Sequence, residues 1–263
     1  MVVAETAQIT PADRLRGIAL LLAAVAQILA GYLPILLDWP VTISDRSAAL
    51  RTPLVPAGYA FSIWGLLFAW LLALSAWQLL QPRFALLQLR RVGWWIAVLF
   101  TIAAVWELYV PWQTLDWVSA ILLLAALGIA LGVSFVLHRD QGLTTSERWL
   151  LAYPLYALAG WLTAAFFANL SSTLMAAGPV WLNPVRLPVA LALLAILFVL
   201  GASVALRLGA YAYVLPLVWA LAAVAVSNLT WAYMPPLAIA AGVSALLLLA
   251  APLLSRRGSQ AAL

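Results

Sequence analysis

The amino-acid sequence predicts an all-α protein, a polytopic bundle of about eight transmembrane helices. Hydrophobic residues make up 67% of its 263 positions, and charged residues make up only 8%. A water-soluble domain carries about 25% charged residues, which cover its surface. With a mean hydropathy of +1.09, this chain is instead expected to be covered by the lipid bilayer, its predicted main partner.

Eight apolar segments are long enough to cross a hydrocarbon core of roughly 30 Å, which needs about twenty residues. The first exceeds the roughly 7–15 apolar residues of a signal peptide, so we expect it to be retained as a span. The longer connections, 38–56 and 171–186, contain Pro and Trp residues, which favour ordered lids over loose linkers. The predicted spans are 16–37, 57–80, 92–112, 117–138, 149–170, 187–207, 210–229 and 235–254.

The arginines predict the orientation of these spans. All thirteen basic residues are arginine, and with eight spans all but Arg46, Arg51 and Arg186 fall on the side of the two termini. Cytoplasmic loops carry an excess of basic residues, so we expect both termini in the cytoplasm. The use of Arg without Lys, beside abundant Ala, Leu and Trp, indicates a GC-rich genome and hence a bacterial inner membrane.

Several kinds of site are not expected. Cysteine is absent, and the single histidine, His138, cannot supply the converging ligands of a metal site. The net charge of +5 is spread singly between apolar runs, which indicates topology rather than a nucleic-acid partner. The sequence predicts no catalytic set, no metal site, no required cofactor and no nucleic-acid binding.

Glu107 is the one acid that falls well inside a span, near the outer end of the third. Ionisable residues inside a membrane are costly and often functional. One interpretation is a carboxylate at a pocket mouth that holds a cation or a polar ligand group. The other is an interfacial residue that reaches water or pairs with Arg46 or Arg51.

Tryptophan occurs fourteen times. Most of these residues lie at span ends, where an aromatic belt is expected, but Trp64, Trp70, Trp161 and Trp219 fall inside spans. Phe61, Trp64 and Phe68 have helical spacing and share a face. Such a face either packs in the core or forms the wall of a pocket for a large planar ligand.

The fourth span contains Gly128 and Gly132, a spacing that lets another helix approach closely. Packing within the monomer and a homodimer face are both open.

The segment 56–68 reads Pro-Ala-Gly-Tyr-Ala-Phe-Ser-Ile-Trp-Gly-Leu-Leu-Phe. It resembles the second-helix signature of the tryptophan-rich sensory protein / translocator protein (TspO/MBR) family. Trp161, followed eight residues later by Asn169, is similar to the family's fifth helix, and Trp106 to its third-helix Trp. The chain departs from the family in having about three more spans, Tyr59 where many members have Trp, and no sterol-type pattern after Asn169.

The resemblance implies an extended, eight-span relative of this family. It divides the chain into a cytoplasmic tail (1–15), a TspO-like five-helix bundle (16–175), three additional helices (176–254) and a cytoplasmic tail (255–263). The seventh span repeats the Trp…Asn pattern loosely, as Trp219 and Asn228, which is either a second half of the site or chance.

By resemblance, a pocket between the first, second and fifth spans lies under the first long loop and takes porphyrins, haem-pathway intermediates or sterols. In that pocket Asn169 is either a polar anchor or an interhelical hydrogen bond. The predicted ligand-binding residues are Tyr59, Phe61, Trp64, Phe68, Trp161, Asn169, Arg51 and Glu107.

The leading prediction is an integral membrane ligand-binding or sensory protein for porphyrin-like or other hydrophobic aromatic ligands, with porphyrin or haem as a ligand rather than a cofactor. A membrane transporter or carrier of a small hydrophobic molecule is one alternative. A membrane enzyme acting on a tetrapyrrole or an isoprenoid is another, although the missing Cys and paired acids argue against hydrolysis.

Overall fold

A computed structural model describes residues 8–80, 83, 86–140, 142–178 and 186–260, with side chains up to residue 255. Within these ranges the chain is helical and has no strand. Eight helical segments are long and apolar enough to cross a membrane. This confirms the predicted polytopic helix bundle, the structure in which every backbone N–H and C=O finds a partner inside its own segment.

The helices follow the predicted spans closely. The second span begins with the 3-10 turn η1, and the fifth joins α6, the π-turn η3 and α7. A short helix, α2, lies in the connection after the first span. The bounds are α1 Pro11–Leu36, α2 Ile43–Ala49, η1 Gly58–Ser62, α3 Ile63–Trp77, α4 Leu87–Trp112, α5 Trp117–His138, α6 Thr145–Glu147, η3 Arg148–Ala152, α7 Tyr153–Ala177, α8 Arg186–Leu208, α9 Tyr211–Thr230 and α10 Pro235–Gln260.

The first and last long helices extend beyond the predicted spans. Helix α1 already begins at Pro11, because Thr10 caps it through a reciprocal pair of hydrogen bonds with Asp13 and Pro11 suits the first helical turn. Helix α10 continues to Gln260, past the expected end of the last span at 254. The second long connection, 171–186, becomes helical up to Ala177, and its remainder falls largely outside the described residues.

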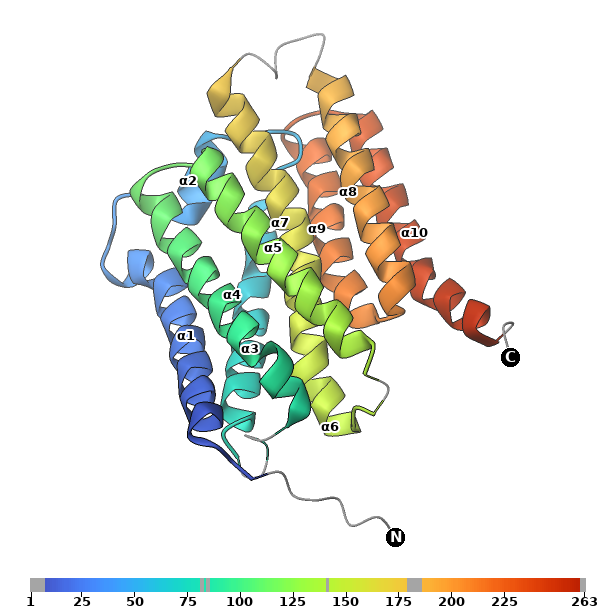
Figure 1. Ribbon diagram of the computed structural model, residues 1–263. Helices are drawn as coiled ribbons and strands as arrows, with labels where there is room; N and C mark the ends of the chain where they lie inside the picture. Colours follow the sequence, from blue (N-terminus) through green and yellow to red (C-terminus); the bar gives the residue numbers. More distant parts are fainter. Residues whose placement is uncertain (1–7, 81–82, 84–85, 141, 179–185, 261–263) are drawn as a thin grey trace.

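Helix α7 lies at the centre of the bundle and is the most buried of the eight spans. It packs against α5 and α3 on one side and against α9 and α8 on the other. Figure 1 shows α1, α3, α4 and α5 as one group and α8, α9 and α10 as another, with α7 between them. The end of the bundle at which α1 begins is called the terminal side below, and the end covered by α2 is called the lid side.

An ion cluster joins α1 to α4 on the terminal side. The Asp13 carboxylate accepts hydrogen bonds from Arg16 Nη1 at 2.8 Å and from Arg90 Nη2 at 2.7 Å. Gly93 leaves room for this arrangement, since a Cβ there would collide with the Arg16 side chain. Two arginines around one buried aspartate therefore bring cations to the start of the bundle without leaving an isolated charge in its interior.

Helices α7 and α9 approach so closely that only glycine fits between them. A Cβ at Gly160 would overlap the backbone carbonyl oxygen of Tyr213. In the same contact, Thr163 Oγ1 and the Tyr213 hydroxyl share a buried hydrogen bond of 3.0 Å. Small residues let transmembrane backbones meet in this way, and packing then drives their association.

The expectation that Gly128 and Gly132 support packing within the monomer is wrong. Both residues lie on an exposed face of α5, and a Cβ at either would meet no atom of the described residues within 4 Å. The alternative, a face that meets a second copy of the chain, stays a prediction.

We predict that Gly160→Ala lowers the thermal unfolding midpoint of the detergent-purified protein. The added methyl group overlaps backbone rather than a flexible side chain, and overpacking of this kind costs about 1–3 kcal/mol. Gly128→Ala is the matched control and should unfold like the wild type. Equal midpoints for the two variants would show that α9 can move away from α7 at little cost.

Candidate functional site

The segment 43–57, called the lid below, covers the lid side of the bundle. It consists of α2 and an irregular stretch with a turn at residues 52–55 that leads into η1. Thr42 and Asp45 form a capping box at the start of α2. Hydrogen bonds from Thr42 lower the pKa of Asp45. The carboxylate therefore stays charged at neutral pH, and the cap weakens only as the pH falls through that lowered value.

Two hydrogen bonds fasten the lid to α7. Thr52 Oγ1 and Ser171 Oγ lie 2.6 Å apart, and Ser172 Oγ donates to the carbonyl oxygen of Leu50 at 2.9 Å. Thr52, Ser171 and Ser172 are all buried. The hydroxyl groups of α7 thus provide hydrogen-bond partners for the Leu50 carbonyl and the Thr52 hydroxyl of the lid. Without them these two buried groups would have no partner, because water does not reach them.

Helix α9 holds the other edge of the lid and the chain that follows it. Asn228 Nδ2 donates to the carbonyl oxygen of Pro53 at 2.7 Å, and the Ala57 amide donates to the Ala223 carbonyl at 3.0 Å. One step further, Trp219 Nε1 donates to the Ala60 carbonyl at 3.0 Å. The Trp…Asn pattern of the seventh span therefore belongs to a set of donors that fix the connection between the first two spans.

The two lid arginines do not contact Glu107. Arg46 Nη2 donates to the Pro111 carbonyl at 3.2 Å. Arg51 Nη2 donates to Ser227 Oγ at 3.2 Å, and its guanidinium carbon lies 4.6 Å from the centre of the Trp231 ring. Arg51 thus reaches toward α9 and the membrane interface. The predicted alternative of a Glu107–Arg pair is wrong in this structure.

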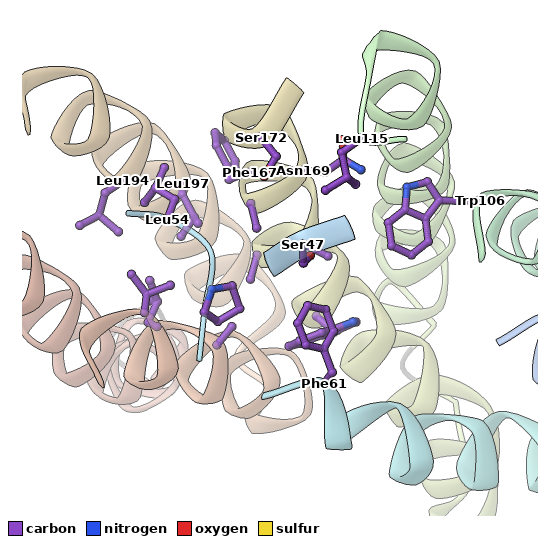
Figure 2. Close-up of a pocket in the computed structure, with 18 residues that line it drawn as sticks. Ser47, Leu54, Phe61, Trp106, Leu115, Phe167, Asn169, Ser172, Leu194 and Leu197 are labelled. Atoms are coloured by element: carbon purple, nitrogen blue, oxygen red, sulfur yellow. The ribbon is translucent and has the colours of Figure 1, made fainter. Parts of the chain in front are cut away.

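A cavity of about 40 Å³ lies beneath the lid. Figure 2 shows its lining spread from Trp106 of α4 at one end to Leu194 and Leu197 of α8 at the other, with Ser47 of α2 between them. Helix α7 supplies the largest share of the lining, including Trp161, Phe167 and Asn169. The cavity has room for only a few water molecules.

An aromatic cluster forms the wall of the cavity toward α3. Phe61 and Trp161 meet edge to face with ring centres 6.3 Å apart, and Trp64 meets Trp161 in the same manner at 6.0 Å. Behind them Trp64 stacks on Phe68 at 5.2 Å. Of the predicted wall residues, Phe61 and Trp161 line the cavity directly, whereas Trp64 and Phe68 support them from the next layer.

Three N–H groups at the cavity lack an acceptor. Trp106 Nε1, Trp161 Nε1 and Asn169 Nδ2 are buried and have no hydrogen-bond partner among the described residues. Their side chains are 6%, 2% and 4% exposed and line one cavity. A buried donor without an acceptor costs about 1–3 kcal/mol, and these three donors are the N–H groups of the lining that an acceptor in the cavity would stabilise.

The amide of Asn169 has a different role at each end. Its Oδ1 accepts hydrogen bonds from Ser119 of α5 at 3.1 Å and from Thr173 at 3.2 Å. The same two hydroxyls also lie within hydrogen-bond distance of the Asp116 carbonyl oxygen, at 2.7 and 3.0 Å. Asn169 therefore takes part in an interhelical hydrogen bond, and its role as a polar anchor stays a prediction.

Glu107 lies between α4 and α1, away from the cavity lining. It is 2% exposed, and its Oε1 lies 3.5 Å from Gln27 Nε2. Its Oε2 has no hydrogen-bond partner in the described part of the chain and would lie 3.5 Å from a Cβ at Gly31. The carboxylate is thus an interior group, and no cluster of three or more His, Asp or Glu side chains accompanies it among the described residues.

The remaining predicted residue, Tyr59, is 48% exposed and packs edge to face on Trp219 at 5.3 Å. Sequence reasoning did not place Leu115, nor the residues that α8 and α9 contribute to the cavity. The Trp…Asn pattern in the seventh span was the available signal that α9 takes part.

We predict that Asn228→Ala loosens the lid. Loss of the donor leaves the Pro53 carbonyl buried without its partner, and hydrogen–deuterium exchange at residues 50–57 should become about five- to tenfold faster. Thr230→Ala is the control on the same helix, because the Thr230 hydroxyl bonds only locally, to the Val226 carbonyl. Unchanged lid exchange in Asn228→Ala would show that α9 does not hold the lid.

Comparison with known proteins supplies one match. A family model described as "TSPO-like protein" matches residues 14–254, which include all eight spans. Neither the curated proteins nor the solved structures contain a match to the chain. The matched range covers most of the chain and agrees with the signatures of the second and fifth spans. The chain therefore belongs to the TSPO-like protein family.

Proposed function

We propose that this TSPO-like membrane protein binds a flat hydrophobic ligand with hydrogen-bond acceptors, of the porphyrin class, beneath its lid. The observation that carries the proposal is the group of donors formed by Trp106, Trp161 and Asn169, which lack acceptors inside a cavity walled by aromatic rings. A ligand that offers carboxylate, carbonyl or ring-nitrogen acceptors would satisfy them.

The two kinds of contact suit different parts of such a ligand. Edge-to-face and stacked rings prefer another π-system beside them and orient it with little loss of side-chain freedom. Buried N–H donors discriminate strongly against a ligand that lacks the matching acceptor. Phe61 and Trp161 would therefore contact the ring face, and the indole and amide N–H groups would fix its polar edge.

Size requires the lid to move. Ligand pockets usually have volumes of about 300–1,000 Å³, whereas the closed cavity has about 40 Å³. Phe61 belongs to η1, which directly follows the lid, so displacing the lid also displaces one wall of the cavity. Each hydrogen bond that holds the lid contributes about 1 kcal/mol to the stability of its position. The free energy gained by binding a large aromatic ligand can offset the loss of these bonds.

A moving lid supports a sensory role. A ligand that fits only the open arrangement shifts the population of the protein toward it. That shift would release Arg46 from the Pro111 carbonyl and Arg51 from Ser227 and Trp231, and so change the charged surface on the lid side. We also propose that the termini face the cytoplasm of a bacterial cell, as the distribution of arginines indicates.

We predict that Trp161→Phe and Asn169→Ala each weaken the binding of protoporphyrin IX about five- to tenfold, because each removes one donor worth about 1 kcal/mol. The measurement is a titration of detergent-purified protein, followed by porphyrin absorbance and by tryptophan quenching. Trp95→Phe is the matched control, since Trp95 is exposed on the surface of α4 and should leave the affinity unchanged.

Two results would contradict the proposal. Absence of saturable porphyrin binding to the wild type would remove the ligand class. Saturable binding that is equally tight in Trp161→Phe, Asn169→Ala and the control would place the ligand elsewhere on the protein.

One observation favours a second candidate, a carrier coupled to protons. Glu107 is buried between two spans and has an oxygen without a hydrogen-bond partner in the described part of the chain. Intramembrane carboxylates of this kind form proton relays in transporters.

We predict for the carrier function that porphyrin uptake into proteoliposomes driven by a pH gradient is lost in Glu107→Gln, while porphyrin binding in detergent is retained. Glu147→Gln is the matched control, the same substitution at a capping position near the start of the fifth span where Gln also serves. Uptake that persists in Glu107→Gln, or that the wild type never shows, would exclude this candidate.

A further inference from the structure

The described structure contains a second, larger cavity on the side of the bundle. Its volume is about 860 Å³. Helices α3 and α9 form its two walls, and the first turns of α7 form its floor. Both wall helices pack against α7, and α9 also meets η1 at the top of α3. We call this cavity the side groove. It shares no lining residue with the cavity beneath the lid.

The side groove extends from the middle of α9 to its terminal-side end. It is closed above by Trp219, which bonds to the Ala60 carbonyl and packs on Tyr59. Along α9 its lining runs from Tyr211 to Trp219, which corresponds to about 12 Å at 1.5 Å per residue. One leaflet of a hydrocarbon core of roughly 30 Å is about 15 Å deep. The groove thus has the depth of a single leaflet.

The walls of the groove are apolar, as an acyl chain requires. Leu66 and Leu67 of α3 face Leu215 and Pro216 of α9 across it. Leu66 and Leu215 are 65% and 54% exposed, so the groove leaves them uncovered by protein. Contact with water is unfavourable for apolar side chains of this kind, and contact with a hydrocarbon chain is favourable.

Aromatic side chains surround the mouth at the depth where a lipid headgroup begins. Trp70, Trp149, Tyr153 and Tyr156 line it, and successive ring centres along this row lie 6.2, 5.4 and 6.1 Å apart. Trp70 Nε1 donates to the Trp149 carbonyl at 2.8 Å and so joins α3 to the start of α7. Trp and Tyr occupy this interfacial level because one part of each ring is apolar and the other is polar.

Arg148 supplies a cation at the same mouth. Its Nε donates to the Leu143 carbonyl at 3.2 Å, and within the described residues no hydrogen bond engages its two terminal nitrogens. Asp140 also lines the groove. Its carboxylate accepts from Gln88 Nε2 at 2.8 Å and from the Gly142 amide at 3.1 Å, and within the described residues it forms no ion pair with Arg148. The guanidinium of Arg148 therefore remains for a phosphate, which it suits geometrically.

The backbone at the mouth has an unusual conformation. Arg148 and Trp149 lie in the π-turn η3, which precedes α7. Single π-turns inside helices are frequent at functional sites. Here the turn places a cation and an aromatic ring at the entrance of one groove.

We propose that the side groove binds one glycerophospholipid of the terminal-side leaflet, with its phosphate at Arg148 and an acyl chain between α3 and α9. The groove depth, the apolar walls, the aromatic mouth and the available guanidinium together favour this occupant. This site is separate from the proposed porphyrin pocket, and its wall α9 belongs to the three helices that follow the five-helix bundle.

The test is native mass spectrometry of delipidated protein supplied with phosphatidylglycerol and with diacylglycerol of the same chains. We expect one phosphatidylglycerol per chain, preferred about fivefold over diacylglycerol, and a loss of this preference in Arg148→Gln. Arg14→Gln is the control, because Arg14 is exposed on the terminal side at the start of α1, which does not line the groove.

Two further variants test where the chain lies. Ala212→Phe and Leu215→Trp fill the groove from α9 and should abolish bound lipid, whereas Ala222→Phe, on the same helix above the Trp219 roof, should not. Leu215 is exposed, so Leu215→Trp keeps the test valid even if Ala212→Phe misfolds. Lipid retained in both filled variants, or an unchanged preference in Arg148→Gln, would overturn the proposal. Two other results would also overturn it: displacement of one bound lipid by each protoporphyrin IX molecule that binds, or formation of a dimer whose interface occupies the groove in place of the lipid.

Discussion

The contact between Gly160 and the Tyr213 carbonyl fixes the position of α9, and the other features of the protein depend on that position. Because no Cβ separates the two backbones, α9 lies deep against α7 and brings Trp219, Ala223 and Asn228 over the connection that follows the first span. Below η1, α3 and α9 both pack against α7, and the side groove lies between them.

The lid joins the two groups of helices into a single functional unit. Its hydrogen bonds reach α7 through Thr52 and α9 through Pro53, and α8 and α9 line the cavity beneath it. A five-helix bundle alone would keep the contacts of the lid with α7 but would lack those with α9. The family match agrees with this view, because it extends across all eight spans rather than ending after the fifth.

The sequence was sufficient for the spans, since lipid exposure leaves a strong record in composition and helices are the only way to satisfy the backbone within each span. The motifs of the second and fifth spans also predicted that Phe61, Trp161 and Asn169 lie together, and all three line the cavity beneath the lid. It could not pair Asn228 with Pro53 across 175 positions, or Glu107 with Gln27 across 80. Such pairs depend on how the helices rotate in the bundle, which spacing alone does not determine. The same limit explains why Gly128 and Gly132, with the right spacing, lie on an outer face.

The π-turn at Arg148–Ala152 has a consequence for the whole fifth span. Each residue advances a helix by about 100°, and a π-turn takes up one residue more than an α-turn. Because the π-turn takes up its extra residue within one turn, removing a single residue there would restore ordinary helical winding and leave the phase of the helix after it unchanged. Trp161, Asn169 and Gly160 would keep their neighbours. The same deletion further along α7 would rotate the rest of the helix by about 100° and turn these residues away from their contacts, so the start of the fifth span is the place where this central helix can lose a residue at least cost.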